Sequence, residues 1–436
     1  MPRETRTDVL VLGAGLTGLN AALELQSHSA DYRLIERSNR VGGHAVTVED
    51  DGFRFDRTGH LLHLRDVETR SQVLDWIGSD HLEIQRRSVI FSHGVFTRYP
   101  FQANAFGLPP EVAYECVQGF VDARLASADR EPYNFEEYCL TQFGPGISKH
   151  FMLPYNSRLW GVPPSEITAD WCHRFVPLPR LEDVIAGAVG LHDRELGYNA
   201  DFVYPRLGIG VLPASMHRDL IRRAELGVAP RRIDYRHKRA HFRHETMAYE
   251  ALVSSIPLPL LIELLDDPPA DVAAAARALR STHLWYLDLA LRIPARLDHH
   301  WVYVPEVKYP FYRVGCYTNF SSALAPVGCS SLYVELVSRE PPPIESVMHE
   351  VVPGLTEMGW LSGPGDIAFA RLRRMDPAYV IFNHAYFRSL SVIKPFLEEE
   401  GIVTAGRYGD WNYSSMEDAL GFGRQAARQA LELIDD

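Results

Sequence analysis

Residues 9–18 are Val9-Leu10-Val11-Leu12-Gly13-Ala14-Gly15-Leu16-Thr17-Gly18, a short apolar run that leads into three glycines. The glycines have the G-x-G-x-x-G spacing of a dinucleotide-binding turn. Gly13 permits the tight turn, Gly15 lets a pyrophosphate approach the backbone, and Gly18 lets the following helix pack closely on the strand. The free N–H groups at the start of that helix favour a bound anion. The stretch therefore predicts a strand, a turn and a helix that bind a dinucleotide.

Three further segments extend this motif toward a flavin site. Residues 32–36 predict a second strand, and its last residue, Glu36, can accept hydrogen bonds from ribose hydroxyls. The glycine pair Gly42-Gly43 resembles the flavoprotein extension of the motif in amine oxidases and their relatives. Residues 404–407 and 416–419 resemble the late strand–helix element by which such proteins hold the flavin. We therefore expect FAD rather than NAD, with contacts from Gly13, Gly15, Gly18, Glu36, Arg37, Gly43, His44, Gly406, Arg407 and Met416.

Composition and charge narrow the class of protein. The chain has 436 residues, enough for two or three packed units, and its net charge of −12 argues against nonspecific binding to nucleic acid. No apolar run reaches the roughly 18 residues that span a bilayer, and the N-terminal pattern is not that of a signal peptide. The five cysteines include no C-x-x-C pair, which favours neither a disulfide framework nor a zinc site. We expect a cytoplasmic protein with no metal and with neither nucleic acid nor membrane as a partner.

Local patterns along the chain predict three domains. Residues 105–195 are mainly helical, with helices that begin near Pro110 and at Phe135, and residues 283–340 have the pattern of strands. Further helices are expected over residues 344–359 and 419–434. We predict an α/β fold that consists of a Rossmann-like FAD-binding domain (residues 1–66, 196–262 and 395–436), an inserted helical domain (105–195) and an antiparallel β-sheet domain (67–104 and 263–394).

Longer segments resemble the UDP-galactopyranose mutases, in particular the eukaryotic-type branch of that family. The matching segments are FDRTGH at residues 55–60, RYPFQAN at 98–104, PYNSRLWGVP at 154–163, NADF at 199–202, YPFYR at 309–313 with Asn319, and GRYGDWNY at 406–413. They are spread over nearly the whole chain and contain rare residues, so they are more specific than the N-terminal glycines. The resemblance implies that the substrate is a nucleotide sugar.

The resemblance also implies an isomerase that uses flavin without net oxidation. In this family reduced FAD attacks the anomeric carbon of the sugar through N5 and displaces the nucleoside diphosphate, which returns after the ring has opened and closed again as a furanose. Such nucleophilic catalysis by a cofactor requires the protein to hold the diphosphate and to orient the sugar. We expect UDP-galactopyranose and UDP-galactofuranose, or a close relative, as substrate and product, and NADH or NADPH as the reductant.

Individual side chains receive roles from the same resemblance. Arg313 matches a diphosphate-binding arginine, and its planar guanidinium suits that group. Gly59 and His60 match a mobile loop that faces the flavin, where the glycine carbonyl accepts the flavin N5–H and the histidine tunes the charge of the flavin. Substrate contacts are expected from Tyr303, Tyr379 and Tyr413 at the diphosphate, from Tyr99, Phe101 and Gln102 at the uracil, from Asn199 at the sugar or nucleotide, and from Tyr155, Asn156 and Trp160.

Several positions depart from the family pattern. Thr58 stands where the family has the first of two glycines before the histidine. Phe175 stands where a second diphosphate-binding arginine is expected, so that role passes to Arg174, one residue earlier, if its side chain reaches the site. Residues 414–418 lack the asparagines of the family, the glycine-rich turn at 207–210 is reduced, and the C-terminal extension of the eukaryotic enzymes is missing. These departures leave open which sugar and which nucleotide the chain takes.

Two other functions stay open at this point. One is a flavin oxidase or desaturase of the amine-oxidase or protoporphyrinogen-oxidase kind, and the other is a flavin-binding protein that has lost catalysis. Arg313 and the tyrosines favour the mutase, because an amine oxidase has no use for a diphosphate clamp. The mutase family is dimeric or tetrameric, and the missing C-terminal extension favours a homodimer.

Overall fold

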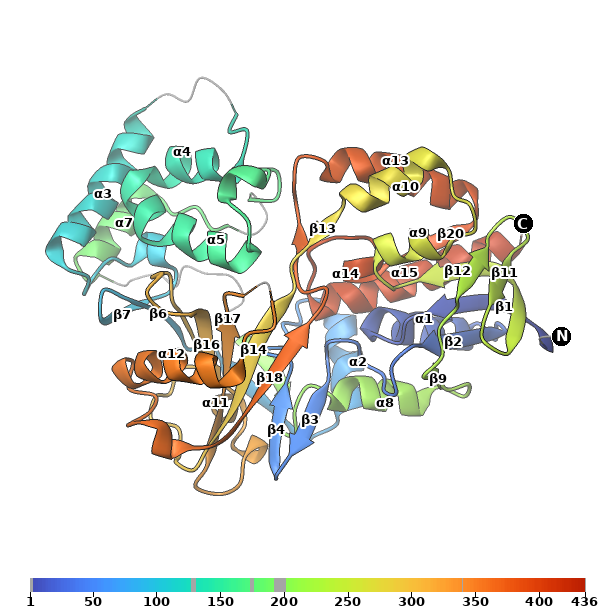
Figure 1. Cartoon of the computed structure of the whole chain (residues 1–436), viewed down its shortest axis with the longest axis horizontal. Coiled ribbons are helices and arrows are strands. Elements are labelled where there is room, and N and C mark those ends of the chain that lie inside the picture. Colours follow the sequence, from blue (N-terminus) through green and yellow to red (C-terminus); the bar gives the residue numbers. More distant parts are fainter. Residues whose placement is uncertain (1–2, 127–130, 173–175, 192–200, 339, 436) are drawn as a thin grey trace.

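The computed structural model describes residues 3–126, 131–172, 176–191, 201–338 and 340–435. Two of the predicted site residues, Arg174 and Asn199, lie outside these ranges. Two seven-stranded sheets lie side by side, and a group of helices lies beyond the second sheet (Figure 1). No helix of the described ranges is both long enough and apolar enough to cross a membrane.

The first sheet is built around the strand of the glycine motif. β1 (Arg3–Leu12) lies between β12 (Glu245–Ser254) and β2 (Tyr32–Glu36) and is parallel to both. Val9 and Val11 pack in one core with α1 (Leu16–Ser27) and α15 (Met416–Asp435), whereas Leu10 and Leu12 pack in another on the opposite face. A strand with both faces covered has this alternation. The other strands of this sheet are β9 (Glu225–Leu226), β10 (Arg232–Asp234), β11 (Arg239–His241) and β20 (Ile402–Thr404).

The second sheet is largely antiparallel and carries most of the predicted substrate residues. Its order is β18 (Ile367–Met375), β14 (Leu284–Leu291), β17 (Ser330–Leu336), β16 (Phe311–Cys316), β15 (Trp301–Tyr303), β6 (Ser88–Ser92) and β7 (Val95–Arg98). One face packs under α12 (Ile344–Glu357) through Leu332, Val334 and their neighbours. Because side chains alternate along a strand, Tyr333 and Glu335 face the other way, and Tyr333 packs in a cluster with Phe55 and Tyr317.

The helical part packs with unusually close backbones. It contains α3 (Pro110–Leu125), α4 (Phe135–Ile147), a π-helical turn (Ser148–Met152), α5 (Leu153–Trp160) and α7 (Leu181–Ala188). A Cβ atom on Gly144 would lie 1.9 Å from the carbonyl oxygen of Gly119, and one on Gly146 would lie 2.0 Å from that of Glu115. Only glycine allows α3 and α4 to approach this closely, which holds α5 and its aromatic residues beside the second sheet.

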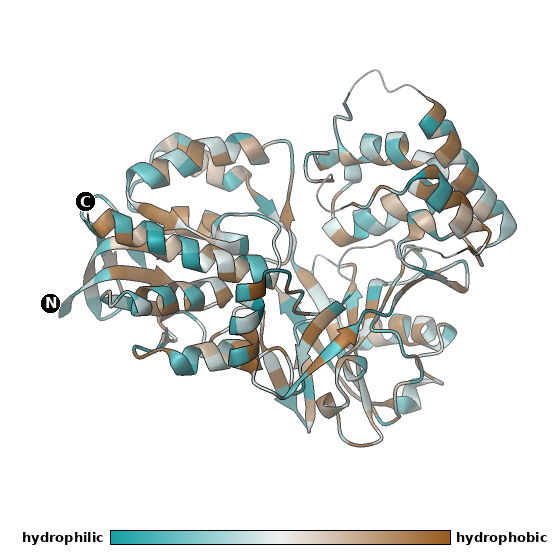
Figure 2. Ribbon diagram, turned by 180° about the vertical axis from the view of Figure 1, so that it is seen from behind, coloured by the Kyte–Doolittle hydropathy of each residue, from teal (hydrophilic) through white to brown (hydrophobic). Residues whose placement is uncertain are grey.

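Further helices and strands connect these three parts. They are β3 (Thr47–Asp50), β4 (Phe53–Asp56), α2 (Val67–Ile77), β5 (His81–Gln85), β8 (Asp201–Pro205), α8 (Val211–Asp219), α9 (Leu258–Leu264), α10 (Ala270–Ala278), β13 (Arg280–Ser281), α11 (Tyr317–Phe320), β19 (Val380–Ile381), α13 (Tyr386–Glu399) and α14 (Gly406–Gly409). In Figure 2 the central strands are largely hydrophobic, whereas the helices show hydrophilic residues outward.

The predicted α/β fold, with its Rossmann-like unit, is confirmed. The helix starts expected near Pro110 and at Phe135 are also observed, and α12 and α15 lie where the sequence places helices. The boundaries of the three domains stay a prediction.

Candidate functional site

The glycine turn between β1 and α1 leaves room for a group that is not part of the chain. Gly13 has a φ of +94°, and a Cβ atom on Gly18 would lie 1.8 Å from the carbonyl oxygen of Gly13, so the chain itself requires both glycines. Gly15 differs, because its φ is −70° and a Cβ atom there would meet no atom within 4 Å. Nothing in the folded chain explains a glycine at this position. A pyrophosphate that approaches the helix N-terminus does explain it.

Two other segments meet the open side of this turn. Gly42 donates a backbone hydrogen bond to Ala14 (2.8 Å), and Gly43 lies beside Gly15, since its Cβ atom would lie 3.4 Å from the Gly15 Cα. At the C-terminal side, a Cβ atom on Gly406 would lie 2.5 Å from the hydroxyl of Thr17. The predicted flavin segments thus converge from three distant parts of the sequence.

The buried carboxylate of Glu36 braces this arrangement. Its Oε2 accepts from the backbone N–H of Ala14 (2.9 Å) and its Oε1 accepts from that of Ser38 (2.8 Å). Each oxygen keeps a further lone pair for a ribose hydroxyl. Arg37 is exposed, and Met416 is half-buried at the first position of α15.

Arg407 and His44 lie further along the same site. Arg407 donates to the carbonyl oxygen of Ser414 through Nη2 (2.5 Å), and its guanidinium lies 4.7 Å from the centre of the Tyr413 ring. Arg57 can only donate, so His44 Nδ1 accepts from it (3.0 Å) and His44 Nε2 donates to the carbonyl oxygen of Pro377 (2.9 Å). Burial and the charge of Arg57 lower the pKa of His44 to about 3, which keeps this imidazole neutral.

The loop of Gly59 and His60 lies between the two sheets. A Cβ atom on Gly59 would lie 2.6 Å from the hydroxyl of Tyr333, so only glycine fits beside that ring. His60 Nδ1 is buried and makes no hydrogen bond within the described residues. Burial, with the charges of Arg407, Arg57 and Arg313, lowers the pKa of His60 to about 4. Thr58 has a φ of +63°, a left-handed conformation that a β-branched residue adopts only under strain.

The second sheet presents a polar row toward this loop. Cross-strand partners place Tyr303 opposite Arg313, Arg313 opposite Glu335, Glu335 opposite Tyr286, and Tyr286 opposite Arg373. All five side chains stand on the face opposite α12, because residues paired across a sheet share a face. The row brings the predicted diphosphate arginine to the centre of the molecule.

Glu335 holds the Arg313 guanidinium in place. Arg313 donates to Glu335 Oε1 through Nε (2.9 Å) and Nη2 (2.6 Å), and Nη2 also reaches the hydroxyl of Tyr379 (3.1 Å). The Glu335 side chain has no exposed surface, and its Oε2 makes no hydrogen bond within the described residues. Arg313 Nη1 has no partner among the described residues either, so one edge of the guanidinium is left to contact a ligand.

Aromatic side chains surround Arg313. Tyr303 stacks on Tyr99 with the ring centres 5.2 Å apart and meets Tyr155 edge to face at 5.5 Å. Tyr379 stacks on Tyr413 at 6.2 Å and meets Trp160 edge to face at 5.8 Å. Burial raises the pKa of Tyr379 to about 12, and it also raises those of Tyr155 and Tyr303. These phenols therefore stay protonated and can donate to a phosphate without adding charge.

Three other predicted substrate residues turn toward the chain. Phe101 stacks on Phe151 in the core, with the ring centres 5.0 Å apart. Gln102 donates to the carbonyl oxygen of Pro177 (2.9 Å), and Asn156 donates to that of Met152 (2.7 Å). The structure thus brings Tyr99, Tyr155, Trp160, Tyr303, Arg313, Tyr379 and Tyr413 together. Phe101, Gln102 and Asn156 also contact the surrounding chain, and their substrate contacts stay a prediction.

The patterns in the sequence did not identify Glu335 and Tyr333 as residues of the site. Residues 331–336 alternate polar and apolar side chains, which was a usable signal that Tyr333 and Glu335 share a face. The partner of Glu335 lies on another strand, so the alternation alone does not identify Arg313. No group of three or more potential metal-ligating side chains lies close together in the described part of the chain.

Known proteins match the chain at two different levels. A family model of the NAD(P)-binding Rossmann-like domain matches residues 11–75. A carotenoid 3,4-desaturase of Haloarcula japonica is 49% identical over 63 residues, which are 14% of this chain and 13% of the desaturase. The family model covers the dinucleotide-binding segment, and the desaturase match covers only about an eighth of that relative.

Solved structures match over nearly the full length. The crystal structure of reduced UDP-galactopyranose mutase superposes with a TM-score of 0.92 at 26% identity and covers 98% of this chain and 96% of the mutase. A putrescine oxidase bound to putrescine superposes with a TM-score of 0.69 at 16% identity, over 98% of this chain and all of the oxidase, which shows a shared fold alone. The resemblance to the mutase therefore extends through all three parts of the fold.

Proposed function

We propose that this chain, which has the fold of UDP-galactopyranose mutase, is a flavin-dependent isomerase that interconverts the pyranose and furanose forms of a nucleotide sugar. UDP-galactopyranose and UDP-galactofuranose, or close relatives, are the proposed substrate and product. The observation that carries the proposal is the Arg313–Glu335 pair, which presents one edge of a guanidinium among five tyrosines beside the flavin loop. Bound FAD in its reduced form supplies the nucleophile, N5, and NADH or NADPH is the proposed reductant.

The chain's own residues hold the leaving group. Arg313 Nη1 and the phenols of Tyr303, Tyr379 and Tyr413 can donate to diphosphate oxygens. Glu335 cancels part of the Arg313 charge and fixes the plane of its guanidinium, so the site need not reorganise when the diphosphate leaves or returns. Tyr99, Tyr155 and Trp160 supply aromatic surface for the base and the sugar. Arg174 and Asn199 stay proposed contacts.

Gly59 and His60 are proposed to respond to the charge of the site. Burial, with a further contribution from three arginines, lowers the pKa of His60 to about 4, so the imidazole is neutral before an anion binds. A bound diphosphate would offset those arginines and raise the pKa of His60 toward neutrality. The histidine can then gain a proton when the substrate arrives and balance the negative charge of reduced flavin.

The cofactor contacts follow the geometry of the glycine turn. Gly13, Gly15, Gly18, Gly43 and the α1 N-terminus are proposed to hold the pyrophosphate, and Glu36 and Arg37 the adenosine. His44, Gly406, Arg407 and Met416 complete the proposed site. A cytoplasmic location and a homodimer are further proposals.

One experiment separates this function from its alternative. The purified flavoprotein is reduced with dithionite in the absence of oxygen, UDP-galactofuranose is added, and chromatography follows the appearance of UDP-galactopyranose. The alternative, an FAD-dependent oxidase or desaturase, has the carotenoid desaturase match in its favour, although that match covers only 14% of this chain. No conversion of any nucleotide sugar, together with release of peroxide from an amine, would refute the mutase.

A further inference from the structure

The hydroxyl of Tyr317 holds the chain just before Gly59 on the flavin loop. Tyr317 belongs to α11, and its Oη lies 2.7 Å from the backbone carbonyl oxygen of Asp56 and 3.2 Å from the backbone nitrogen of Thr58. These two backbone groups flank a single residue, and Thr58 has a left-handed backbone with a φ of +63°. We refer to residues 56–58 as the hinge of the flavin loop, because the backbone there sets the direction in which the loop leaves β4.

A third group reaches the same hydroxyl. Asp288 Oδ1 lies 3.0 Å from Tyr317 Oη, and the Asp288 side chain, on β14, has no exposed surface. A hydroxyl has one proton to donate and two lone pairs that accept. Thr58 N–H occupies one lone pair, and the Asp56 carbonyl can only accept. An ionised Asp288 therefore competes with that carbonyl for the phenol proton, whereas a protonated Asp288 donates to the phenol and leaves its proton to the carbonyl.

We propose that Asp288 is a positioning residue of the flavin loop, and that it acts through Tyr317, which holds the hinge fully only while Asp288 carries a proton. In that state Tyr317 donates to Asp56 and accepts from both Thr58 and Asp288. When the proton leaves to solvent, the carboxylate takes the phenol hydrogen bond, since a charged acceptor binds it more strongly than a carbonyl does. The Asp56 carbonyl is then released, and the loop, whose role toward the flavin rests on the proposed function, exchanges conformations more readily.

The neighbours of Asp288 bring its two states close to balance. Burial raises the pKa of Asp288 to about 7 against the opposing effects of Arg373 and Tyr317, and the charge of Asp56 adds to the rise. Arg373 Nε donates to Asp288 Oδ2 (2.5 Å). Burial raises the pKa of Tyr317 as well, so the phenol keeps its proton at neutral pH. The titratable and charged groups around Asp288 are Tyr317 on α11, Tyr333 on β17, Asp56 and Arg57 at the hinge, Tyr286 on β14, and Arg371 and Arg373 on β18.

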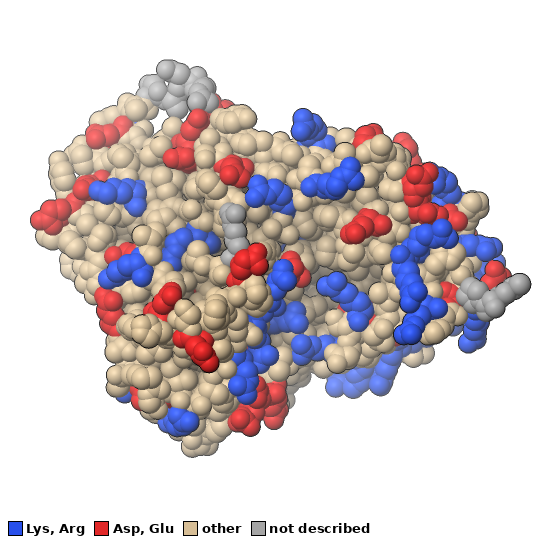
Figure 3. Space-filling view, in the orientation of Figure 1, with Lys and Arg blue, Asp and Glu red and all other residues tan. Residues whose placement is uncertain are grey.

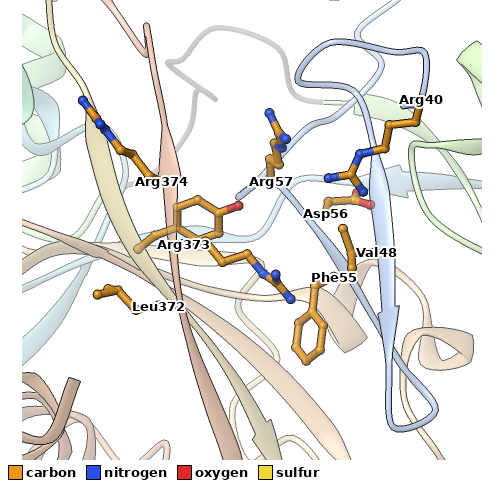
Figure 4. A pocket seen from close by; sticks show the side chains of 9 residues that line it. Arg40, Val48, Phe55, Asp56, Arg57, Leu372, Arg373 and Arg374 are labelled. Atoms are coloured by element: carbon orange, nitrogen blue, oxygen red, sulfur yellow. The ribbon is translucent and has the colours of Figure 1, made fainter. Parts of the chain in front are cut away.

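A cavity connects the neighbours of Asp288 with solvent. It has a volume of about 230 Å³ and opens between β18 and the hairpin of β3 and β4, with Asp56, Arg57, Tyr286 and Arg373 in its walls. Figure 4 shows Arg373 reaching from β18 toward this hairpin, with Asp56 and Arg57 on the opposite wall. In Figure 3, Lys and Arg side chains gather in the hollow of the surface over this region. The proton of Asp288 can therefore exchange with water that enters this cavity.

The test follows the loop and the proton separately in the oxidised holoenzyme, from about pH 5.5 to about 8.5, a range that brackets the pKa of Asp288. Relaxation of the flavin fluorescence measures how fast the loop exchanges conformations, and the infrared C=O band of a protonated carboxyl group measures the proton. In the native protein we expect the exchange rate to rise about tenfold as the pH rises through about 7, the ratio that one net hydrogen bond corresponds to. The carboxyl band should disappear over the same range.

Two variants fix the loop in either state. The amide N–H of Asp288→Asn can donate to Tyr317 at every pH, so this variant should lack the Asp288 component of the carboxyl band and keep the slow rate throughout. Tyr317→Phe has no hydroxyl to hold the hinge, so its loop should exchange fast at every pH while the carboxyl band still titrates. If Asp288→Asn does not fold, Tyr317→Phe still decides the outcome, because a native pH profile in that variant would overturn the proposal.

Asp56→Asn is the matched control, because it removes a second buried carboxyl group, whose oxygens accept from Thr47 (2.6 Å) and Tyr204 (2.6 Å). The contact of Asp56 with Tyr317 is made by the backbone carbonyl, which this substitution leaves in place. The step in the exchange rate should remain and move to somewhat lower pH, because the Asp56 charge no longer opposes the ionisation of Asp288. Loss of the step in Asp56→Asn would assign the titration to Asp56 and overturn the proposal.

The remaining outcomes separate this proposal from the proposed function. An exchange rate that does not change with pH in the native protein, or a native pH profile in Asp288→Asn, overturns the role of Asp288 and leaves the mutase standing. If the loop rate and the carboxyl band change together but the dithionite-reduced native enzyme converts no nucleotide sugar, the proposed function fails and the positioning role of Asp288 stands.

Discussion

Replacement of Gly15 by alanine should separate flavin binding from folding. Gly15 is the N-cap of α1, with a φ of −70° that alanine adopts freely, and an added Cβ atom would meet nothing within 4 Å. Alanine is a poorer N-cap than glycine by about 0.5 kcal/mol, and it recovers a similar amount by restricting the unfolded chain. The free energy of unfolding of the apoprotein should therefore change by less than about 0.5 kcal/mol.

The effect on the cofactor should be much larger. The methyl group would occupy the space through which a pyrophosphate approaches the N–H groups at the start of α1. Each hydrogen bond from a backbone N–H to a charged oxygen contributes about 1.5–3 kcal/mol. The loss of one or two of them, about 3 kcal/mol in all, should weaken FAD binding by about 100-fold.

Gly18→Ala is the matched contrast to this variant. Its Cβ atom would lie 1.8 Å from the carbonyl oxygen of Gly13, so β1 and α1 must separate and the apoprotein itself should lose stability by about 3 kcal/mol or more. The assay is fluorescence titration of each apoprotein with FAD, alongside its urea unfolding curve. Stoichiometric FAD binding with native affinity in Gly15→Ala would refute the reasoning about this turn.

Three further predictions concern the clamp, the flavin loop and a buried acid. Arg313→Ala should weaken UDP binding by about 2–3 kcal/mol while FAD stays bound, and unchanged UDP affinity in calorimetry would show that the clamp is misassigned. Thr58→Gly replaces a β-branched residue in the left-handed conformation by glycine, which adopts that conformation without strain. The loop of Gly59 and His60 should therefore exchange conformations faster in Thr58→Gly than in Thr58→Ala, where the strain remains. Relaxation of the flavin fluorescence measures this rate, and equal rates in the two variants would contradict the prediction. Burial raises the pKa of Asp56 to about 6. Between about pH 4 and 6 the folded state therefore keeps a proton on Asp56 that the unfolded state has released, and the free energy of unfolding falls as the pH rises over that range. Asp56→Asn should remove this fall in the free energy of unfolding, measured by urea unfolding at each pH. The same pH dependence in the variant and in the native protein would contradict the prediction.

The dinucleotide turn was predictable because its signal is local. Gly13, Gly15 and Gly18 act within one strand–turn–helix, and the residues that define it are neighbours in the chain. The helix starts near Pro110 and at Phe135 are local for the same reason, since they depend on backbone angles and capping over a few residues. For Arg313, the resemblance to a family supplied a role that spacing alone does not.

Phe101 and Gln102 show how much a pattern of residue types leaves to the packing. An aromatic residue followed by an amide suits a base-binding pocket and a buried anchor, because both need flat apolar surface and a polar group. The packed structure shows that Phe101 stacks on Phe151 and that Gln102 donates to Pro177, and their contacts to the uracil stay a prediction.

The sequence alone established a Rossmann-like flavin-binding chain, because contiguous glycines, strands and helices carry that information. The tertiary structure established the partners of the reactive groups. Glu335 meets Arg313 through the register of two antiparallel strands, and one cavity is lined both by Arg57 and by Arg373 of β18, more than 300 residues further along the chain. The physical reason is that charge compensation depends on distances between side chains in space, which the packing of two sheets determines and which no local pattern encodes.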